Sequence, residues 1–153
     1  MALNLADWSK EHIREVFEAS TDELSLRAIN STFSRSLAAT LNGSPLDFDM
    51  LCGLVSAMRK QTLPSTGLRV EWRHADATPD DSSNRNGNFV GEYYIRGIWR
   101  AISESEQLVE FERRKKVSAR IECGFSSRDN SNSNRRIVKL DIVATDTQIQ
   151  ENR

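Results

Sequence analysis

Apolar residues recur every three or four positions in the first part of the chain, which is the spacing of amphipathic helices. This spacing predicts a first helix over residues 5–19 and a short second helix that ends near Asn30. Ser20 and Glu23 have the spacing of a capping box, in which the two side chains satisfy free backbone N–H groups. We therefore expect the second helix to start at this serine.

A short strand and a third helix are predicted next. The apolar residues over 33–41 share one parity, which indicates a strand, and Asn42-Gly43 is a turn signal. Ser44 then precedes a proline, and this pair is typical of the cap and the first residue of a helix. The apolar face of that helix begins at Phe48.

After Gly67 the period of the pattern changes to two, which is typical of strands with one buried and one solvated face. The inward parity includes Leu68, Val70, Trp72, His74, Phe89, Tyr93, Ile95, Trp99, Val117, Ile121, Leu140, Ile142 and Ala144. Charged residues occupy the other parity. Arg113 and Lys115 break the pattern because they share the parity of the apolar residues.

The length of 153 residues fits one domain over 1–153, with a core over about 5–145, mobile loops over about 76–88 and 126–136, and a polar C-terminal tail. No apolar run approaches the ~20 residues of a membrane span, so no membrane contact is expected. The N-terminus lacks the apolar stretch of a secretory signal, which predicts a cytoplasmic protein. A net charge of −1 favours no nucleic-acid partner.

Known motifs for cofactors and metals are missing from the sequence. Cys52 and Cys123 have no CxxC spacing and no neighbouring histidine, which predicts free thiols and no zinc site. No glycine-rich phosphate loop, HExxH motif or Ser-His-Asp order is present. The prediction is a protein without a cofactor or a metal.

The order of these elements, with the segments NGSPLDFDMLCGLVSAMRK, GLRVEW and FVGEYYIRGIWRAI, resembles the SnoaL-like and nuclear transport factor 2-like superfamily. The resemblance covers about residues 5–145. It implies an α+β fold, in which N-terminal helices pack on a curved, mostly antiparallel sheet and form a cone with a pocket. The superfamily contains polyketide cyclases, isomerases and dehydratases, and also non-catalytic binding and transport modules, many of them dimers.

Two residues are candidates for catalysis in such a pocket. An imidazole on the inner face, that of His74, could carry a proton, although a solvated histidine at a strand end is an equally simple interpretation. The Tyr93 hydroxyl could donate a hydrogen bond to a carbonyl oxygen, or the ring could be a core residue with a polar tip. Trp72, Trp99 and Phe48 are predicted to contact a substrate as apolar walls.

Arg113 is the fourth candidate for substrate contact. An inward guanidinium is costly unless it meets a carboxylate, a ligand anion or water, and a β-bulge would return it to the surface. Superfamily enzymes commonly combine an acid with a histidine, but the strand acids that the pattern identifies all fall on the outer parity. This departure argues against an acid–base pair. The basic run 113–116 is better explained by cross-strand charge pairs than by phosphate binding.

Two hypotheses of function follow. The first is binding of a small apolar carbonyl metabolite, with cofactor-independent isomerisation, cyclisation or dehydration if the protein is an enzyme. The second is a non-catalytic interaction module, most simply a homodimer, that uses the charged outer face of the sheet with its aromatic Tyr94 and apolar Ile98.

Overall fold

The computed structural model describes residues 4–63, 67–101, 107–124 and 134–149. The helices are α1 (Leu5–Glu18), α2 (Asp22–Thr32) and α3 (Phe48–Arg59). The strands are β1 (Phe33–Leu41), β2 (Ser44–Leu46), β3 (Arg69–Pro79), β4 (Gly87–Ala101), β5 (Leu108–Cys123) and β6 (Arg135–Gln148).

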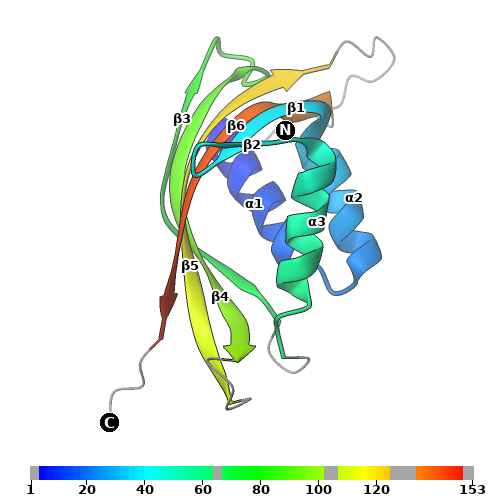
Figure 1. Cartoon of the computed structure of the whole chain (residues 1–153). Helices are drawn as coiled ribbons and strands as arrows, with labels where there is room; N and C mark the ends of the chain where they lie inside the picture. Colours follow the sequence, from blue (N-terminus) through cyan, green and yellow to red (C-terminus); the bar gives the residue numbers. More distant parts are fainter. Residues whose placement is uncertain (1–3, 64–66, 102–106, 125–133, 150–153) are drawn as a thin grey trace.

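The strands form one sheet in the order β2-β1-β6-β5-β4-β3. Within it β1 and β6 are parallel, and the other neighbours are antiparallel. The sheet is strongly curved, and all three helices lie on its concave face (Figure 1). The predicted α+β cone is therefore confirmed. None of the described helices is long and apolar enough to cross a membrane.

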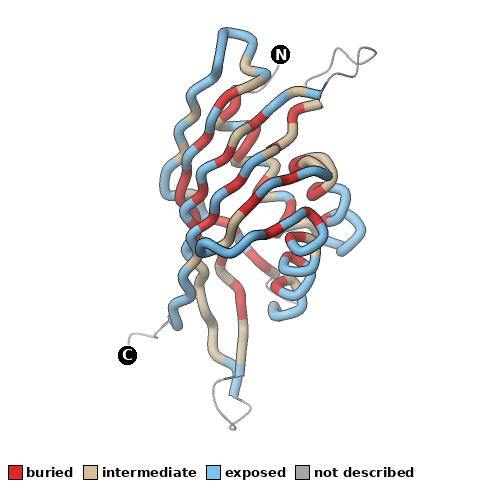
Figure 2. The backbone as a smooth tube through the Cα atoms, turned by 45° about the horizontal axis from the view of Figure 1, so that its top comes forward, coloured by how far each residue is buried: buried red, intermediate tan, exposed pale blue. Residues whose placement is uncertain are grey.

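The core lies between the helices and the concave face of the sheet. Buried and exposed positions alternate along the strands, as the two-residue period predicts (Figure 2). Fully buried residues of the sheet include Phe89, Ile95, Ile98, Ile121 and Ile137. Each side chain of this kind stabilises the fold by about 1.5–3 kcal/mol when it leaves water, so this layer is the main source of stability.

Both predicted helix caps are wrong by a few residues. The cap of α2 is Thr21, whose hydroxyl accepts a hydrogen bond from the Leu24 backbone N–H at 3.1 Å, instead of Ser20. The cap of α3 is Asp47, which accepts from the Met50 N–H at 2.8 Å. A side-chain oxygen at the predicted or at the observed position can satisfy a free N–H group of the helix, so the residue types alone do not distinguish the two positions.

The Asn42-Gly43 turn explains why Ser44 cannot start a helix. Both residues have positive φ, 51° and 84°, which is the geometry of a tight hairpin. The turn folds Ser44–Leu46 back onto β1 as an antiparallel partner, with Ala39 opposite Leu46. Residues 44–46 are therefore strand β2, and the helix begins only after them.

Two irregularities of register reverse several predicted faces. In β3, Trp72 lies opposite Tyr93 but His74 lies opposite Glu92, so one extra residue separates them and His74 faces outward. In β4, the extra residue falls between Ile95 and Ile98. The sequence carries no direct signal for the first bulge, whereas the second coincides with a glycine.

Gly97 forms the bulge of β4 with a φ of 91°, a conformation that favours glycine. Beyond it Ile98 is fully buried, so its predicted outward position is wrong. Trp99 lies opposite Glu110 and faces away from the core, and Arg100 turns inward, so the predicted faces of these two residues are wrong as well.

The strands are longer than predicted. β3 continues to Pro79 and β4 starts at Gly87, so the connection predicted over 76–88 is confined to 80–86. Most of the loop predicted over 126–136 lies outside the described residues. β6 does not end near Ala144 but continues to Gln148, which places Asp146 on a strand of the sheet.

Candidate functional site

Lys115 is an ammonium group enclosed inside the cone. It lies on β5, and only 6% of the residue is exposed. Its Nζ lies 4.6 Å from the centre of the Phe17 ring on α1 and 5.9 Å from that of Tyr93 on β4. Within the described part of the chain it forms no hydrogen bond and no ion pair, so its contacts are with aromatic faces alone.

The protonation of Lys115 follows from this position. Burial and, to a smaller extent, the nearby positive charge of Arg113 together lower the Lys115 pKa to about 7, while Asp146 acts in the opposite direction. Near neutral pH a large fraction of the side chain is therefore the neutral amine, which can accept a proton or act as a nucleophile.

Tyr93 lies beside Lys115 on the inner face, as predicted. It is 3% exposed, and its ring packs against Trp72, with 4.6 Å between ring centroids. Burial raises the pKa of its hydroxyl, so the group keeps its proton and acts as a donor. None of the described residues forms a hydrogen bond with this hydroxyl.

Lys115 and Tyr93 line one small cavity of about 20 Å³ between the helices and the sheet. This volume accommodates about one water molecule. Its other walls are apolar and consist of Ile13, Val16, Phe17, Phe33, Leu51, Val55, Val117, Leu140 and Ile142. The site is therefore an apolar enclosure with two polar groups, one of them a proton donor.

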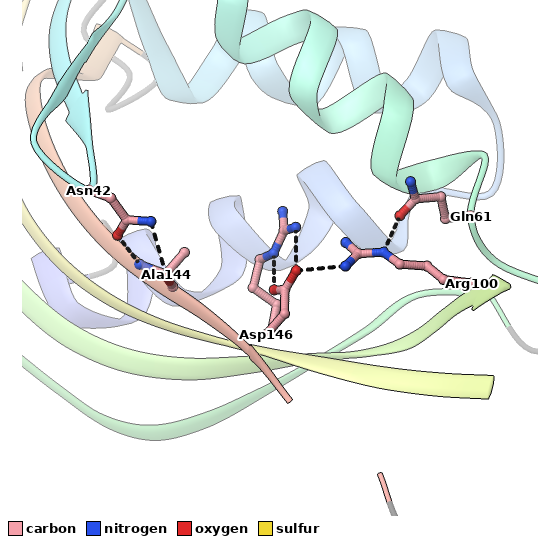
Figure 3. A network of polar contacts seen from close by, with 6 residues as sticks. Asn42, Gln61, Arg100, Ala144 and Asp146 are labelled. Atoms are coloured by element: carbon pink, nitrogen blue, oxygen red, sulfur yellow. Dashed lines mark hydrogen bonds and ion pairs between the residues drawn. The ribbon is translucent and has the colours of Figure 1, made fainter. Parts of the chain in front are cut away.

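Arg113 faces inward, as its parity predicts, and its partner is Asp146. The guanidinium Nε and Nη2 donate to the two carboxylate oxygens at 2.7 and 3.0 Å. Arg100 Nη1 donates to the same carboxylate at 2.8 Å, and its Nε donates to the Gln61 side chain at 3.1 Å (Figure 3). The network joins three strands to the segment that follows α3.

Asp146 is the inward acid that the sequence analysis missed. It shares its parity with Ile142 and Ala144, but the polar residues around it suggested that the strand had already ended. Hydrogen bonds from Arg113, followed by those from Arg100, lower its pKa to about 2. A carboxylate held by two guanidinium groups is a weak base, so Asp146 fixes the arginines instead of moving protons.

His74 is absent from this site. Its side chain is 57% exposed on the outer face, with Nε2 3.7 Å from a carboxylate oxygen of Glu92. Arg114 pairs with the same carboxylate. The prediction that His74 faces the pocket is wrong because the bulge after Trp72 turns it to the other side of the sheet.

The three predicted walls have different positions. Trp72 lies on the inner side and covers the Tyr93 ring, as expected. Phe48 is buried at the start of α3, under the guanidinium of Arg35 at 5.4 Å, and is not among the cavity residues. Trp99 lies on the opposite face of the sheet. None of the three therefore lines the cavity, and Trp72 is connected to it through its contact with the Tyr93 ring.

The described residues contain no group of three or more His, Cys, Asp or Glu side chains that could hold a metal ion. Cys52 and Cys123 are both free thiols.

Solved structures with the same architecture identify the class of fold. IdmH of Streptomyces antibioticus, a candidate polyketide cyclase, matches with a TM-score of 0.61 and 14% identity over 89% of this chain and 91% of that chain. A chain of the Mex67:Mtr2 complex with bound Sac3N peptide matches with a TM-score of 0.57 and 10% identity, over 92% and 97%. An NTF2-like protein of Rhodospirillum rubrum matches with a TM-score of 0.52 and 11% identity, over 91% and 97%.

The chain thus has the NTF2-like, or SnoaL-like, fold that its sequence resembles. No family model and no curated protein matches the sequence itself. Identities of this size show the fold and leave the activity open, because this fold carries both enzymes and binding modules.

Proposed function

We propose that this protein binds a small, largely apolar carbonyl compound inside the cone, with Lys115 and Tyr93 as its polar contacts. The observation that carries the proposal is that both groups are buried at one cavity without a hydrogen-bond partner among the described residues. A ligand oxygen between the two would give both groups a hydrogen-bond partner inside a mostly apolar enclosure.

The same geometry supports cofactor-independent isomerisation, cyclisation or dehydration of the ligand. Lys115 takes the role of proton carrier that the sequence suggested for His74, since its neutral amine can remove a proton beside a carbonyl group. Tyr93 keeps its proton and would donate a hydrogen bond to the carbonyl oxygen, on which negative charge develops. The paired Arg113 and Asp146 stiffen the adjoining strands.

The size of the cavity limits how the ligand enters. Typical ligand sites are ~300 Å³ or larger, far above the 20 Å³ observed. Binding therefore requires the side chains that separate Lys115 from solvent to move, and Phe17 is the large side chain stacked on its ammonium group. We expect the ligand to take the place of this ring over Lys115.

Tryptophan fluorescence tests the proposal because Trp72 packs directly on Tyr93. The protein is titrated with small aromatic and aliphatic carbonyl compounds, alongside Lys115→Met and His74→Ala. We expect saturable quenching in the wild type and in His74→Ala, and at least tenfold weaker binding in Lys115→Met, which corresponds to about 1.4 kcal/mol. Equal affinity in all three proteins, or no saturable response in the wild type, contradicts the proposal.

The near-complete filling of the cone favours a second candidate, a non-catalytic module that associates through the outer face of the sheet. That face exposes Val90 and Val143, at 47% and 58%. Its charges pair within the chain, for example Arg96 with Glu71 at 2.6 Å and with Glu112 at 3.2 Å. The two valines would therefore provide the apolar contact of a homodimer.

A further inference from the structure

The surroundings of Lys115 resemble those of a nucleophilic lysine more closely than those of a lysine in a structural ion pair. A buried lysine usually has a carboxylate partner, whereas the carboxylate that acts on Lys115 among the described residues, that of Asp146, is held by Arg113 and Arg100. Lysines become nucleophilic when they are desolvated in an apolar pocket or placed near a second cation. Lys115 has both features.

We propose that Lys115 condenses with the carbonyl group of an aldehyde or ketone ligand and holds it as an imine. This inference rests on the proposed function, since it requires that the carbonyl compound binds at the same cavity. It goes further because the ligand becomes covalently attached, and because it limits the ligands to carbonyl groups that an amine can attack, which excludes carboxylates and amides.

The condensation needs no other reactant. The Nζ lone pair forms a bond to the carbonyl carbon while the C=O π electrons move to the oxygen, which takes up a proton as the nitrogen loses one. The resulting carbinolamine loses its hydroxyl with a further proton as water, and the nitrogen lone pair forms the C=N bond. One amine and one carbonyl group thus give one imine and one water molecule, without oxidation or reduction.

The groups around Lys115 suit each stage. Arg113 on the same strand disfavours the ammonium form by charge repulsion. Tyr93 supplies a hydroxyl for the carbonyl oxygen and for the departing water. The surfaces that α1 and α3 contribute to the cavity are apolar, with Ile13, Val16, Phe17, Leu51 and Val55, so they offer no charge that would restore the ammonium form.

Lys116 provides an internal reference. It is the next residue on β5 but faces outward and is exposed, opposite Val143 on β6 and Glu92 on β4. Water solvates the ammonium form of an exposed lysine, and Lys116 therefore lacks the apolar enclosure that favours a neutral, nucleophilic amine. Lys115 and Lys116 are therefore adjacent in the sequence but differ in burial, which is the property on which the proposal depends.

The test is reductive trapping of the intact chain at pH 7. Propanal and benzaldehyde are each added with sodium cyanoborohydride, which reduces an imine to a stable secondary amine, and the modified lysines are located by peptide mass spectrometry. We expect Lys115 to be modified at least tenfold faster than Lys116.

Fluorescence titration separates ligand binding in the cavity from imine formation at Lys115. It uses the same aldehydes and, as compounds without a carbonyl group, propanol and benzyl alcohol. Saturable quenching by an aldehyde without selective modification of Lys115 overturns the imine and leaves the proposed function standing. The absence of both quenching and modification overturns both. Lys115→Met, if folded, should lose the modification, and the comparison with Lys116 in the wild type decides the question if that variant does not fold.

Discussion

At the scale of single residues, the burial of Lys115 lowers the stability of the folded protein. Its charged form loses water and is repelled by Arg113, and it gains aromatic contacts and a smaller attraction to Asp146. Residues that lower stability in this way are common at functional sites, where activity requires an environment that packing alone would not select. The pH dependence of stability can measure this cost.

Lys115→Met should stabilise the protein at neutral pH by up to about 4 kcal/mol, because the pKa of about 7 in the folded state lies well below the ordinary value of 10.5. Between these values the unfolded chain binds the extra proton, so wild-type stability rises with pH from about 7 to 10.5. Urea unfolding should show the largest difference between the two proteins at or below pH 7 and a small one above 10.5. A variant less stable than the wild type at pH 7 contradicts the assigned environment.

Asp146→Asn should destabilise the protein by about 1–3 kcal/mol at pH 7, because Arg113 and Arg100 lose a partly buried partner. The carboxyl pKa is lowered from 3.8 to about 2, so this contribution is complete above 3.8 and disappears as the pH falls through 2. Urea unfolding at pH 7, 4 and 2.5 should show the difference shrinking.

Asp141→Asn is the matched control for that measurement. Asp141 lies on the same strand, but on the outer face, where its carboxylate accepts one hydrogen bond from Thr40 at 2.8 Å. Its replacement should change stability by less than about 1 kcal/mol. Equal losses in the two variants would show that Asp146 has no special role in holding the arginines.

The sequence predicted the site residues that follow simple alternation. Tyr93, Trp72 and the inward Arg113 are all placed by a two-residue period counted within a regular segment. Lys115 was visible as an exception to the pattern, but its sequence neighbours could not show that Asp146 would be taken by two arginines. That depends on side chains that lie 30 or more positions apart along the chain.

At the scale of elements, β-bulges decide which residues reach the pocket. A single extra residue reverses every later position of a strand, which moved His74 out of the site and Arg100 into it. Turn chemistry was easier to predict, as at Asn42-Gly43, because both residues must adopt positive φ there. A bulge without a glycine leaves no comparable signal, and the one before His74 contains Arg73.

Gly97→Ala tests the bulge of β4. The residue has positive φ, and an added Cβ would lie 2.3 Å from the Gly67 carbonyl oxygen, so the backbone would have to move. Gly43→Ala is the control, since Gly43 also has positive φ but no atom within 4 Å of such a Cβ. Gly43→Ala should cost about 1–2 kcal/mol and Gly97→Ala about 1–3 kcal/mol more, measured by denaturant unfolding. Equal costs would show that the segment adapts freely.

At the scale of the whole molecule, the change from a helical to a two-residue period predicted helices followed by strands, and the resemblance to the NTF2-like superfamily implied the curved cone. Helices with one apolar face and strands with one apolar face can bury both only by packing in two layers. The curved cone is also the fold of IdmH and of a chain of the Mex67:Mtr2 complex. The extent to which the cone is filled could not be predicted, because it depends on how the side chains of α1 and α3 fit against the sheet.

The outer face of the sheet carries the last prediction, which concerns assembly. Val90 and Val143 lie on β4 and β6, on either side of β5, on a surface where several of the charged side chains are paired within the chain, such as Arg96 with Glu71 and Glu112. In a two-fold dimer each substitution acts twice, so Val143→Lys should introduce two charges into one apolar contact. Sedimentation equilibrium at ~100 μM should show a wild-type dimer whose affinity falls at least tenfold in this variant.

Met50→Lys is the control for the assembly measurement, because Met50 is also an apolar side chain that is 51% exposed, but it lies on α3, on the other side of the sheet. Its replacement should leave the dimer unchanged. A monomeric wild type, or a dimer that is disrupted by Met50→Lys and not by Val143→Lys, rejects the outer face as the interface. A monomeric wild type would exclude a second copy of the chain as the partner of the proposed interaction module. The buried amine of Lys115 would then be the stronger indication of function.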